Sequence, residues 1–168
     1  ESGLLGSEAY VQRPLVPLAR TAAVLNLDVT NVRGATRDIS ALGLDRSTLG
    51  AVFRAAARAE GLTVDLRPDV RGSFFRSDHF PFARAGVPAL SFKPGVRFVG
   101  REDDWGEEAE QRYNAERYHQ PSDEYSPAFR YDGMAQQVRV AVRVALAVPN
   151  APELPRWVPG SEFQRPNP

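Results

Sequence analysis

The sequence predicts one α/β domain, in which helices pack against a β-sheet. Two patterns indicate this fold class: short continuous apolar runs, typical of buried strands, alternate with segments that place apolar residues on one helix face. The chain has 168 residues, enough for one domain with its own core. Hydrophobic residues make up 42% and charged residues 25%, proportions that fit an ordinary globular protein.

The first predicted elements are a short helix and a strand. Residues 4–12 are expected to form the helix, which ends before Pro14 because proline disrupts a helix interior. Residues 22–28 are a nearly continuous apolar run that ends in Asp28. Such a run is typical of a strand buried on both faces, so we expect it to lie inside the sheet.

The next elements are a longer helix and a short strand. Residues 47–60 carry apolar side chains at helical spacing, with Ser47 as the expected N-cap and Gly61 as the expected C-cap. Residues 62–66 are expected to form the strand. The two helical flanks of the sheet should be this helix and a second one nearer the carboxyl end.

The second half of the chain predicts one more strand and that second helix. Residues 80–84 are expected to form one or two helical turns, and residues 87–92 a strand. Residues 97–117 are charged and show little periodicity, so we expect mostly a long surface loop. Residues 133–148 are expected to form the last helix. Its apolar side should carry Met134, Val138, Ala141, Val142 and Ala145.

Composition excludes several classes of function. Lys plus Arg equals 21 and so does Asp plus Glu, and this balance argues against a nucleic-acid partner. The absence of cysteine excludes disulfides, thiolate metal sites and cysteine nucleophiles. No apolar run approaches the ~20 residues of a membrane span. No signal peptide is visible, and the oligomeric state is not predicted.

The two histidines, His79 and His119, both lie among polar and acidic residues. Either could be an ordinary surface or core residue. Asp28, however, ends a predicted buried strand, and ligands gather at the carboxyl ends of strands in open α/β sheets. Carboxylates together with imidazole are ligands that zinc accepts. Spacing alone leaves both interpretations open.

Four segments, taken together and in order, resemble peptidase family M28. The family motifs are Glu-Glu-x-Gly-Leu-Leu-Gly-Ser, Asn-x-Asp, Ser-Asp-His followed by Gly-Val-Pro, and Tyr-His-x-x-x-Asp. The matching segments are Glu1-Ser2-Gly3-Leu4-Leu5-Gly6-Ser7, Asn26-Leu27-Asp28, Ser77-Asp78-His79 with Gly86-Val87-Pro88, and Tyr118-His119-Gln120-Pro121-Ser122-Asp123. The resemblance implies a three-layer α/β sandwich with a mostly parallel or mixed central sheet, as in zinc exopeptidases. Residues 1–148 would be the C-terminal part of this peptidase domain, and residues 149–168 a Pro-rich tail.

The resemblance also implies site residues. Glu1 aligns with a ligand of one zinc ion, and Asp28 and His119 align with ligands of a second. Tyr118 aligns with a tyrosine that can donate a hydrogen bond to the oxyanion of the reaction, although a packing role is an open alternative.

Four further residues would surround these ligands. Asp123 could orient His119, as metal-bound histidines usually require, or cap its loop. Ser77, Asp78 and His79 have no ligand counterpart in the family and would form the pocket wall and support the ligands. A purely structural hydrogen-bonded turn is the alternative for these three.

The activity implied is that of an aminopeptidase with two zinc ions, acting on a peptide with a free amino terminus. The family's other ligands and its general-base glutamate align before Glu1. We therefore expect a fold that is incomplete at the N-terminus and a 168-residue chain that is inactive alone. Alternatives are a glutaminyl-cyclase-like acyltransferase, against which Tyr118 argues, and a non-catalytic domain of the same family. The resemblance further implies a secreted or periplasmic protein.

Overall fold

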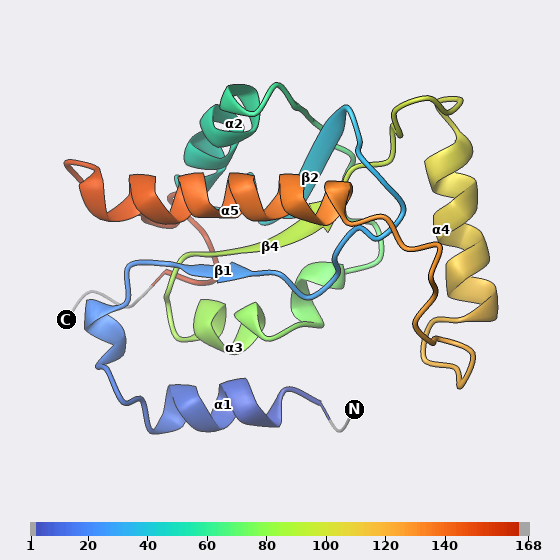
Figure 1. Ribbon diagram of the computed structural model, residues 1–168. Helices are drawn as coiled ribbons and strands as arrows, with labels where there is room; N and C mark the ends of the chain where they lie inside the picture. Colours follow the sequence, from blue (N-terminus) through green and yellow to red (C-terminus); the bar gives the residue numbers. More distant parts are fainter. Residues whose placement is uncertain (1–2, 165–168) are drawn as a thin grey trace.

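A mixed sheet of four strands separates two layers of helices in the computed structural model, which describes residues 3–164 (Figure 1). The strand order is β1-β4-β2-β3. β1 runs parallel to β4, β2 runs parallel to β3, and β2 and β4 are antiparallel. The strands are β1 (Val24–Asn26), β2 (Asp38–Leu42), β3 (Thr63–Val64) and β4 (Ala89–Pro94). The predicted α/β sandwich with a mixed sheet is therefore confirmed.

The helices lie on both faces of the sheet and beside it. Helices α2 and α5 pack against each other over one face, whereas α3 lies against β1 and β4 on the other, with α1 beyond it (Figure 1). Helix α4 stands to one side of the sheet. The helices are α1 (Leu5–Gln12), α2 (Leu49–Ala59), α3 (His79–Arg84), α4 (Trp105–Glu116) and α5 (Asp132–Asn150), with short 3-10 turns at Leu18–Arg20 and Ser73–Phe75.

The larger hydrophobic cluster fills the space between the sheet and the α2–α5 layer. Phe53 of α2 meets Phe92 of β4 edge to face, with ring centroids 5.3 Å apart, and both side chains are fully buried. Burying one such side chain contributes about 1.5–3 kcal/mol. Helix α2 ends as predicted before Gly61, whose φ of 71° is a left-handed conformation that glycine adopts at little cost. The helices predicted at residues 4–12, 47–60 and 133–148 are confirmed.

A second, mostly aromatic cluster lies on the α3 side and includes the tail. Phe163 packs against Phe74, and Trp157 packs against Phe163, with both tail side chains only 5% exposed. The tail is also joined to the start of α2. The Arg156 backbone N–H donates to Oγ1 of Thr48, and the Thr48 N–H donates to the Arg156 carbonyl. The segment after α5 is thus part of the packed structure, and the division at residues 148 and 149 stays a prediction.

The predicted position of the first strand is wrong. Among residues 3–164, β1 forms one edge of the sheet, and its three residues are only half-buried. The apolar run has a different cause: Leu25 packs against the larger cluster, while Val24 packs against the aromatic one. An edge strand with both faces covered also needs apolar residues at successive positions, because side chains alternate between faces.

Two details of the helix predictions are also wrong. Helix α2 starts after Thr48, and the buried Ser47 hydroxyl has no hydrogen-bond partner among residues 3–164, so Ser47 is no side-chain cap. In α5 the predicted apolar side includes Val138 and Val142, which are 45% and 50% exposed. Valine recurs so often in this helix that two stripes fit helical spacing. The buried stripe is Gly133, Gln137, Val140, Ala141, Val144 and Val148.

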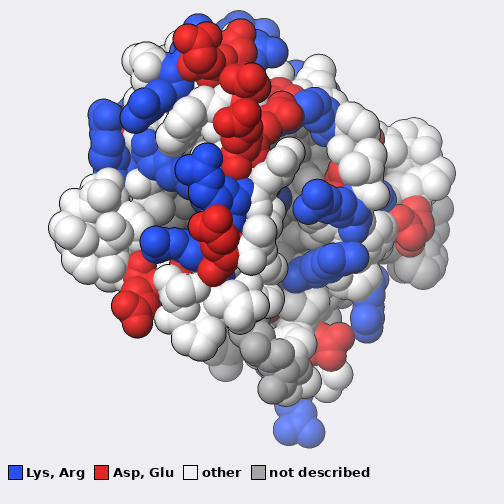
Figure 2. Space-filling view, turned by 90° about the vertical axis from the view of Figure 1, so that its right-hand side faces the viewer, with Lys and Arg blue, Asp and Glu red and all other residues white. Residues whose placement is uncertain are grey.

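The surface loop predicted for residues 97–117 is likewise wrong, because α4 occupies most of it. Among its residues only Gly106 is buried, so the helix shows no apolar period. Good helix formers and the acidic first turn, with Glu107 and Glu108, favour it instead. Figure 2 shows this side of the molecule, where acidic and basic side chains lie next to one another.

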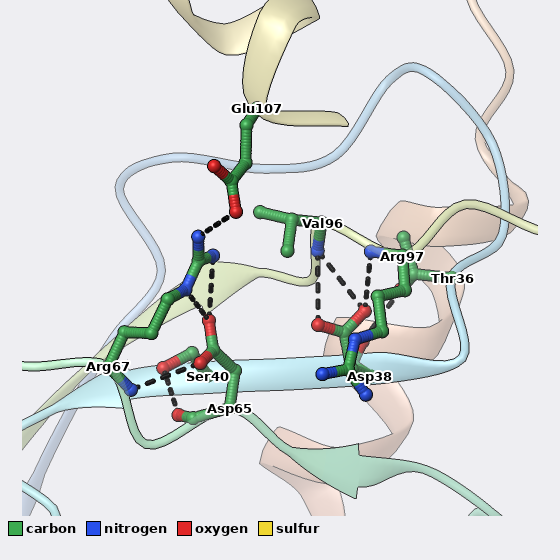
Figure 3. A network of polar contacts seen from close by, with 8 residues as sticks. All are labelled: Thr36, Asp38, Ser40, Asp65, Arg67, Val96, Arg97 and Glu107. Atoms are coloured by element: carbon green, nitrogen blue, oxygen red, sulfur yellow. Dashed lines mark hydrogen bonds and ion pairs between the residues drawn. The ribbon is translucent and has the colours of Figure 1, made fainter. Parts of the chain in front are cut away.

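Ion pairs and buried hydrogen bonds join α4 and the turn after β4 to the sheet (Figure 3). Arg67 bridges Asp65, which follows β3, and Glu107 of α4. Beside them the Asp38 carboxylate, 2% exposed, accepts hydrogen bonds from the backbone N–H groups of Val96 and Arg97, at 3.1 and 2.8 Å. Buried backbone donors are thereby satisfied. No helix within residues 3–164 is long and apolar enough to cross a membrane.

Candidate active site

Polar side chains from β1, β4 and the loop before α3 meet where β1 ends. Asn26 and Ser91 are register partners on the parallel strands β1 and β4. The Asn26 amide donates to the hydroxyls of Ser91, at 3.1 Å, and Ser77, at 2.8 Å. The Ser77 hydroxyl in turn donates to Oδ2 of Asp28 at 2.6 Å. We call these four residues the Asp28 relay.

The Asp28 relay fixes a carboxylate that is open to solvent. Asp28 is exposed, whereas Ser77 and Asn26 are half-buried and Ser91 is buried. A hydroxyl-to-carboxylate bond of this length is a short, charge-assisted hydrogen bond. Oδ2 is therefore oriented from within the protein. This is the arrangement expected of a carboxylate held ready for a cation or a polar ligand.

Asp78 connects the same loop to α1. The Ser7 hydroxyl donates to Oδ1 of Asp78 at 2.6 Å, and Glu8 of α1 forms an ion pair with Arg84 of α3. The structure thus brings Ser77, Asp78 and the motif serine Ser7 to one side of the sheet. Glu1, six residues before Ser7, lies outside the described residues.

His79 is fully buried, with 0% of its surface exposed. Its ring meets Phe74 edge to face at 4.7 Å, and neither ring nitrogen has a hydrogen-bond partner of full geometry among the described residues. Burial lowers the pKa of His79 to about 4, although a looser contact with the Phe74 backbone and the charges of Asp28 and Asp78 oppose this. The imidazole is therefore neutral near pH 7 and lies inside the aromatic cluster, behind the loop that carries Ser77.

His119 lies in the turn that follows α4. Its φ of 59° is left-handed, and it is the one non-glycine residue with positive φ in the described part of the chain. Tyr118, 47% exposed, stacks on the His119 ring with centroids 3.9 Å apart. Asp123 accepts a hydrogen bond from the hydroxyl of Tyr113 at 2.8 Å, so its carboxylate is tied to α4. Burial, and then this hydrogen bond, raise the pKa of Tyr113.

The metal-binding side chains of the described residues do not form a complete site. Within residues 3–164, no three His, Asp or Glu side chains lie close enough together to hold a metal ion. Asp28 and His119 are donors of the right type, but the described residues do not complete a metal shell by themselves. The convergence of Glu1, Asp28 and His119 stays a prediction, as do the roles of Tyr118 and Asp123.

Sequence reasoning did not assign a role to four residues at these sites. For Ser91 the sequence offers one indication of a role, a hydroxyl inside an otherwise apolar strand. Asn26 and Ser7 occurred in the quoted motifs, but no partner could be predicted for them without the strand register. For Tyr113 the sequence offers no such indication, because the segment that forms its helix is predicted to be a loop.

Comparisons with known proteins identify a family. No curated protein and no solved structure matches the chain. A family model described as "Peptidase family M28" matches residues 1–144, which include the Asp28 relay, the loop before α3 and the turn with His119. Because this match covers most of the 168 residues, the chain belongs to peptidase family M28, a family of hydrolases of the metallopeptidase type.

Proposed function

We propose that this chain carries metal-binding and substrate-facing residues of a zinc-dependent aminopeptidase. The observation that supports this most directly is the Asp28 relay, which orients an exposed carboxylate at the end of a strand. Such internal hydrogen bonding to a carboxylate is typical of metal ligands. His119 is proposed as the second donor to the same ion, and Glu1 as a donor to another.

The remaining roles follow from where the side chains lie. The exposed phenol of Tyr118 can donate to an oxygen on which negative charge develops when a peptide bond is attacked. Ser77 and Asn26 would hold Asp28 in place rather than contact the substrate. The proposed substrate is a peptide with a free amino terminus, and the proposed location is outside the cytoplasm, as a secreted or periplasmic protein.

Zinc affinity tests the metal-binding part of the proposal. Asp28→Asn and His119→Gln should each weaken zinc binding by at least about 10–100-fold, the usual cost of losing even a supporting partner of a metal site. Asp45→Asn, at an exposed carboxylate outside the site, is the matched control and should leave zinc binding unchanged. Equal zinc affinity in all four proteins would rule out Asp28 and His119 as ligands.

Hydrolysis tests the activity itself. The complete gene product should cleave aminoacyl-anilides, lose that activity with a chelator and regain it with zinc. Conversion of N-terminal glutamine into a pyroglutamyl residue that stays on the peptide, with release of ammonia and no peptide-bond hydrolysis, would instead indicate a cyclase. Zinc binding without either reaction would indicate a non-catalytic member of the family.

A further inference from the structure

The turn that carries His119 is held in a conformation that needs support. Residues with a β-carbon seldom adopt left-handed backbone angles, because the β-carbon then crowds the following carbonyl. His119 does so in an exposed turn, at a φ of 59°. A strained residue keeps such a conformation only where its surroundings enforce it. The contacts that fasten this turn therefore decide where the imidazole points.

Backbone hydrogen bonds from Gln120 to Arg117 and from Asp123 to Gln120 close the turn itself, and three further hydrogen bonds fasten it to the last part of α4. The Tyr118 N–H donates to the Tyr113 carbonyl at 2.9 Å, and the Ser122 hydroxyl donates to the Glu116 carbonyl at 2.7 Å. The third joins two side chains, since the Tyr113 hydroxyl donates to Oδ2 of Asp123 at 2.8 Å. Its acceptor is a carboxylate, so it is stronger than a hydrogen bond between neutral groups.

The Tyr113 ring is itself fixed in place. It is half-buried, and the guanidinium of Arg33 lies over it, 5.2 Å from the ring centroid. On another side it meets the ring of Tyr118 at 6.2 Å, and Tyr118 stacks on His119. Tyr113 thus reaches the turn at two points: through its hydroxyl at Asp123, and through its ring at the Tyr118–His119 stack.

We propose that Tyr113 is a positioning residue that sets the orientation of the His119 imidazole through Asp123 and Tyr118. This inference rests on the proposed function only for its consequence, that the orientation matters for zinc. Helix α4, which lies beside the sheet, would then hold the turn that carries His119. Asp123 would fix the orientation of His119 through this turn, without contacting the imidazole.

Nuclear magnetic resonance of the imidazole groups tests the positioning directly, because the chain has only two histidines. In the parent protein the His119 ring protons should show the upfield shift of a stacked ring and Overhauser contacts to Tyr118. Tyr113→Phe keeps the ring and removes the hydroxyl. It should weaken these contacts and move the shift toward its value in the urea-unfolded chain. The His79 signals, from the separate aromatic cluster, should not change and so show that the fold is intact.

The matched control is Tyr125→Phe, at a tyrosine that is 74% exposed and whose hydroxyl has no hydrogen-bond partner among the described residues. Asp123→Ala should reproduce the effect of Tyr113→Phe, and the double variant should add little, since both remove the same bond. An unchanged His119 signature in Tyr113→Phe, or the same change in Tyr125→Phe, would overturn the inference.

Zinc titration then separates the inference from the proposed function. With zinc alone as the probe, Tyr113→Phe should bind about tenfold more weakly than the parent if His119 is a ligand. If neither protein binds zinc while the His119 signature still changes, the metal proposal fails and the positioning of His119 by Tyr113 stands. If the parent binds zinc and Tyr113→Phe retains both the signature and the affinity, the positioning role is refuted.

Discussion

Replacing His79 by glutamine is expected to flatten the dependence of stability on pH. The imidazole is fully buried and packs on Phe74, and burial lowers its pKa from 6.5 to about 4. Above pH 6.5 the group is neutral in both the folded and the unfolded chain and contributes no pH dependence. Between these two pKa values the unfolded chain binds a proton that the folded chain does not, so the free energy of unfolding decreases as the pH falls.

The size of the effect follows from the two pKa values. One pKa unit corresponds to about 1.4 kcal/mol, so the parent protein should lose about 3 kcal/mol over the full interval. By about pH 5 the loss should be about 2 kcal/mol. Below pH 4 both states bind the proton and His79 adds no further loss. This contribution is a large fraction of the 5–15 kcal/mol that is roughly the total stability of a domain.

The assay is urea unfolding of the parent, His79→Gln and His119→Gln at several pH values. The difference between the parent and His79→Gln isolates the contribution of the buried imidazole. His119→Gln removes the chain's other imidazole, which is exposed, and is the comparison for losing a histidine outside the core. Parallel curves for the parent and His79→Gln would show that His79 is accessible to protons in the folded state, and the reasoning from burial would fail.

Three further substitutions test other contacts. Ser77→Ala should weaken zinc binding about 10–100-fold while leaving the unfolding temperature nearly unchanged, and Ser161→Ala in the tail is its control. Equal zinc affinities of the parent and Ser77→Ala would mean that the Asp28 relay does not support a metal ligand. Phe163→Ala should lower the free energy of unfolding by about 3 kcal/mol in urea melts, whereas Leu154→Ala, at a residue 61% exposed, should leave it nearly unchanged. Equal losses in the two variants would contradict the packing of the tail. Asp38→Ala leaves two backbone N–H groups unpaired and should lower the free energy of unfolding by about 1–3 kcal/mol. An unchanged free energy of unfolding would show that water reaches these two groups.

Periodicity predicted the elements that bury one face, and it failed where burial is not periodic. Helix α2 was predicted because Phe53, Ala56 and Ala57 repeat at helical spacing and all face the core. Helix α4 was not, since it buries only Gly106. β2 was not predicted either: Asp38 interrupts its apolar pattern, and only the structure shows that backbone N–H groups satisfy that carboxylate.

Site residues were predictable in part, through short motifs. Asp28, Ser77 and Asp78 belong to recognisable motifs, and in the structure the Ser77 hydroxyl donates a hydrogen bond to Asp28. Ser7, the partner of Asp78, is distant in sequence and depends on the docking of α1. Ser91, the partner of Asn26, depends on strand register. The support of the His119 turn could not be predicted, because it depends on a helix whose sequence carries no apolar period.

Because a ribosome synthesises the chain from its N-terminus, the position of the aromatic tail determines when the second cluster can form during translation. Phe74, Ala83 and Ala89 are synthesised long before Trp157 and Phe163, yet all five residues form one buried cluster. Chains emerge at roughly 5–20 residues per second, so these apolar surfaces stay uncovered for several seconds of translation. The larger cluster draws all its buried residues from positions before 149 and can assemble earlier. The cluster behind Ser77 and His79 can close only after the tail has been made, and until then its apolar surface on the α3 side of the sheet stays uncovered.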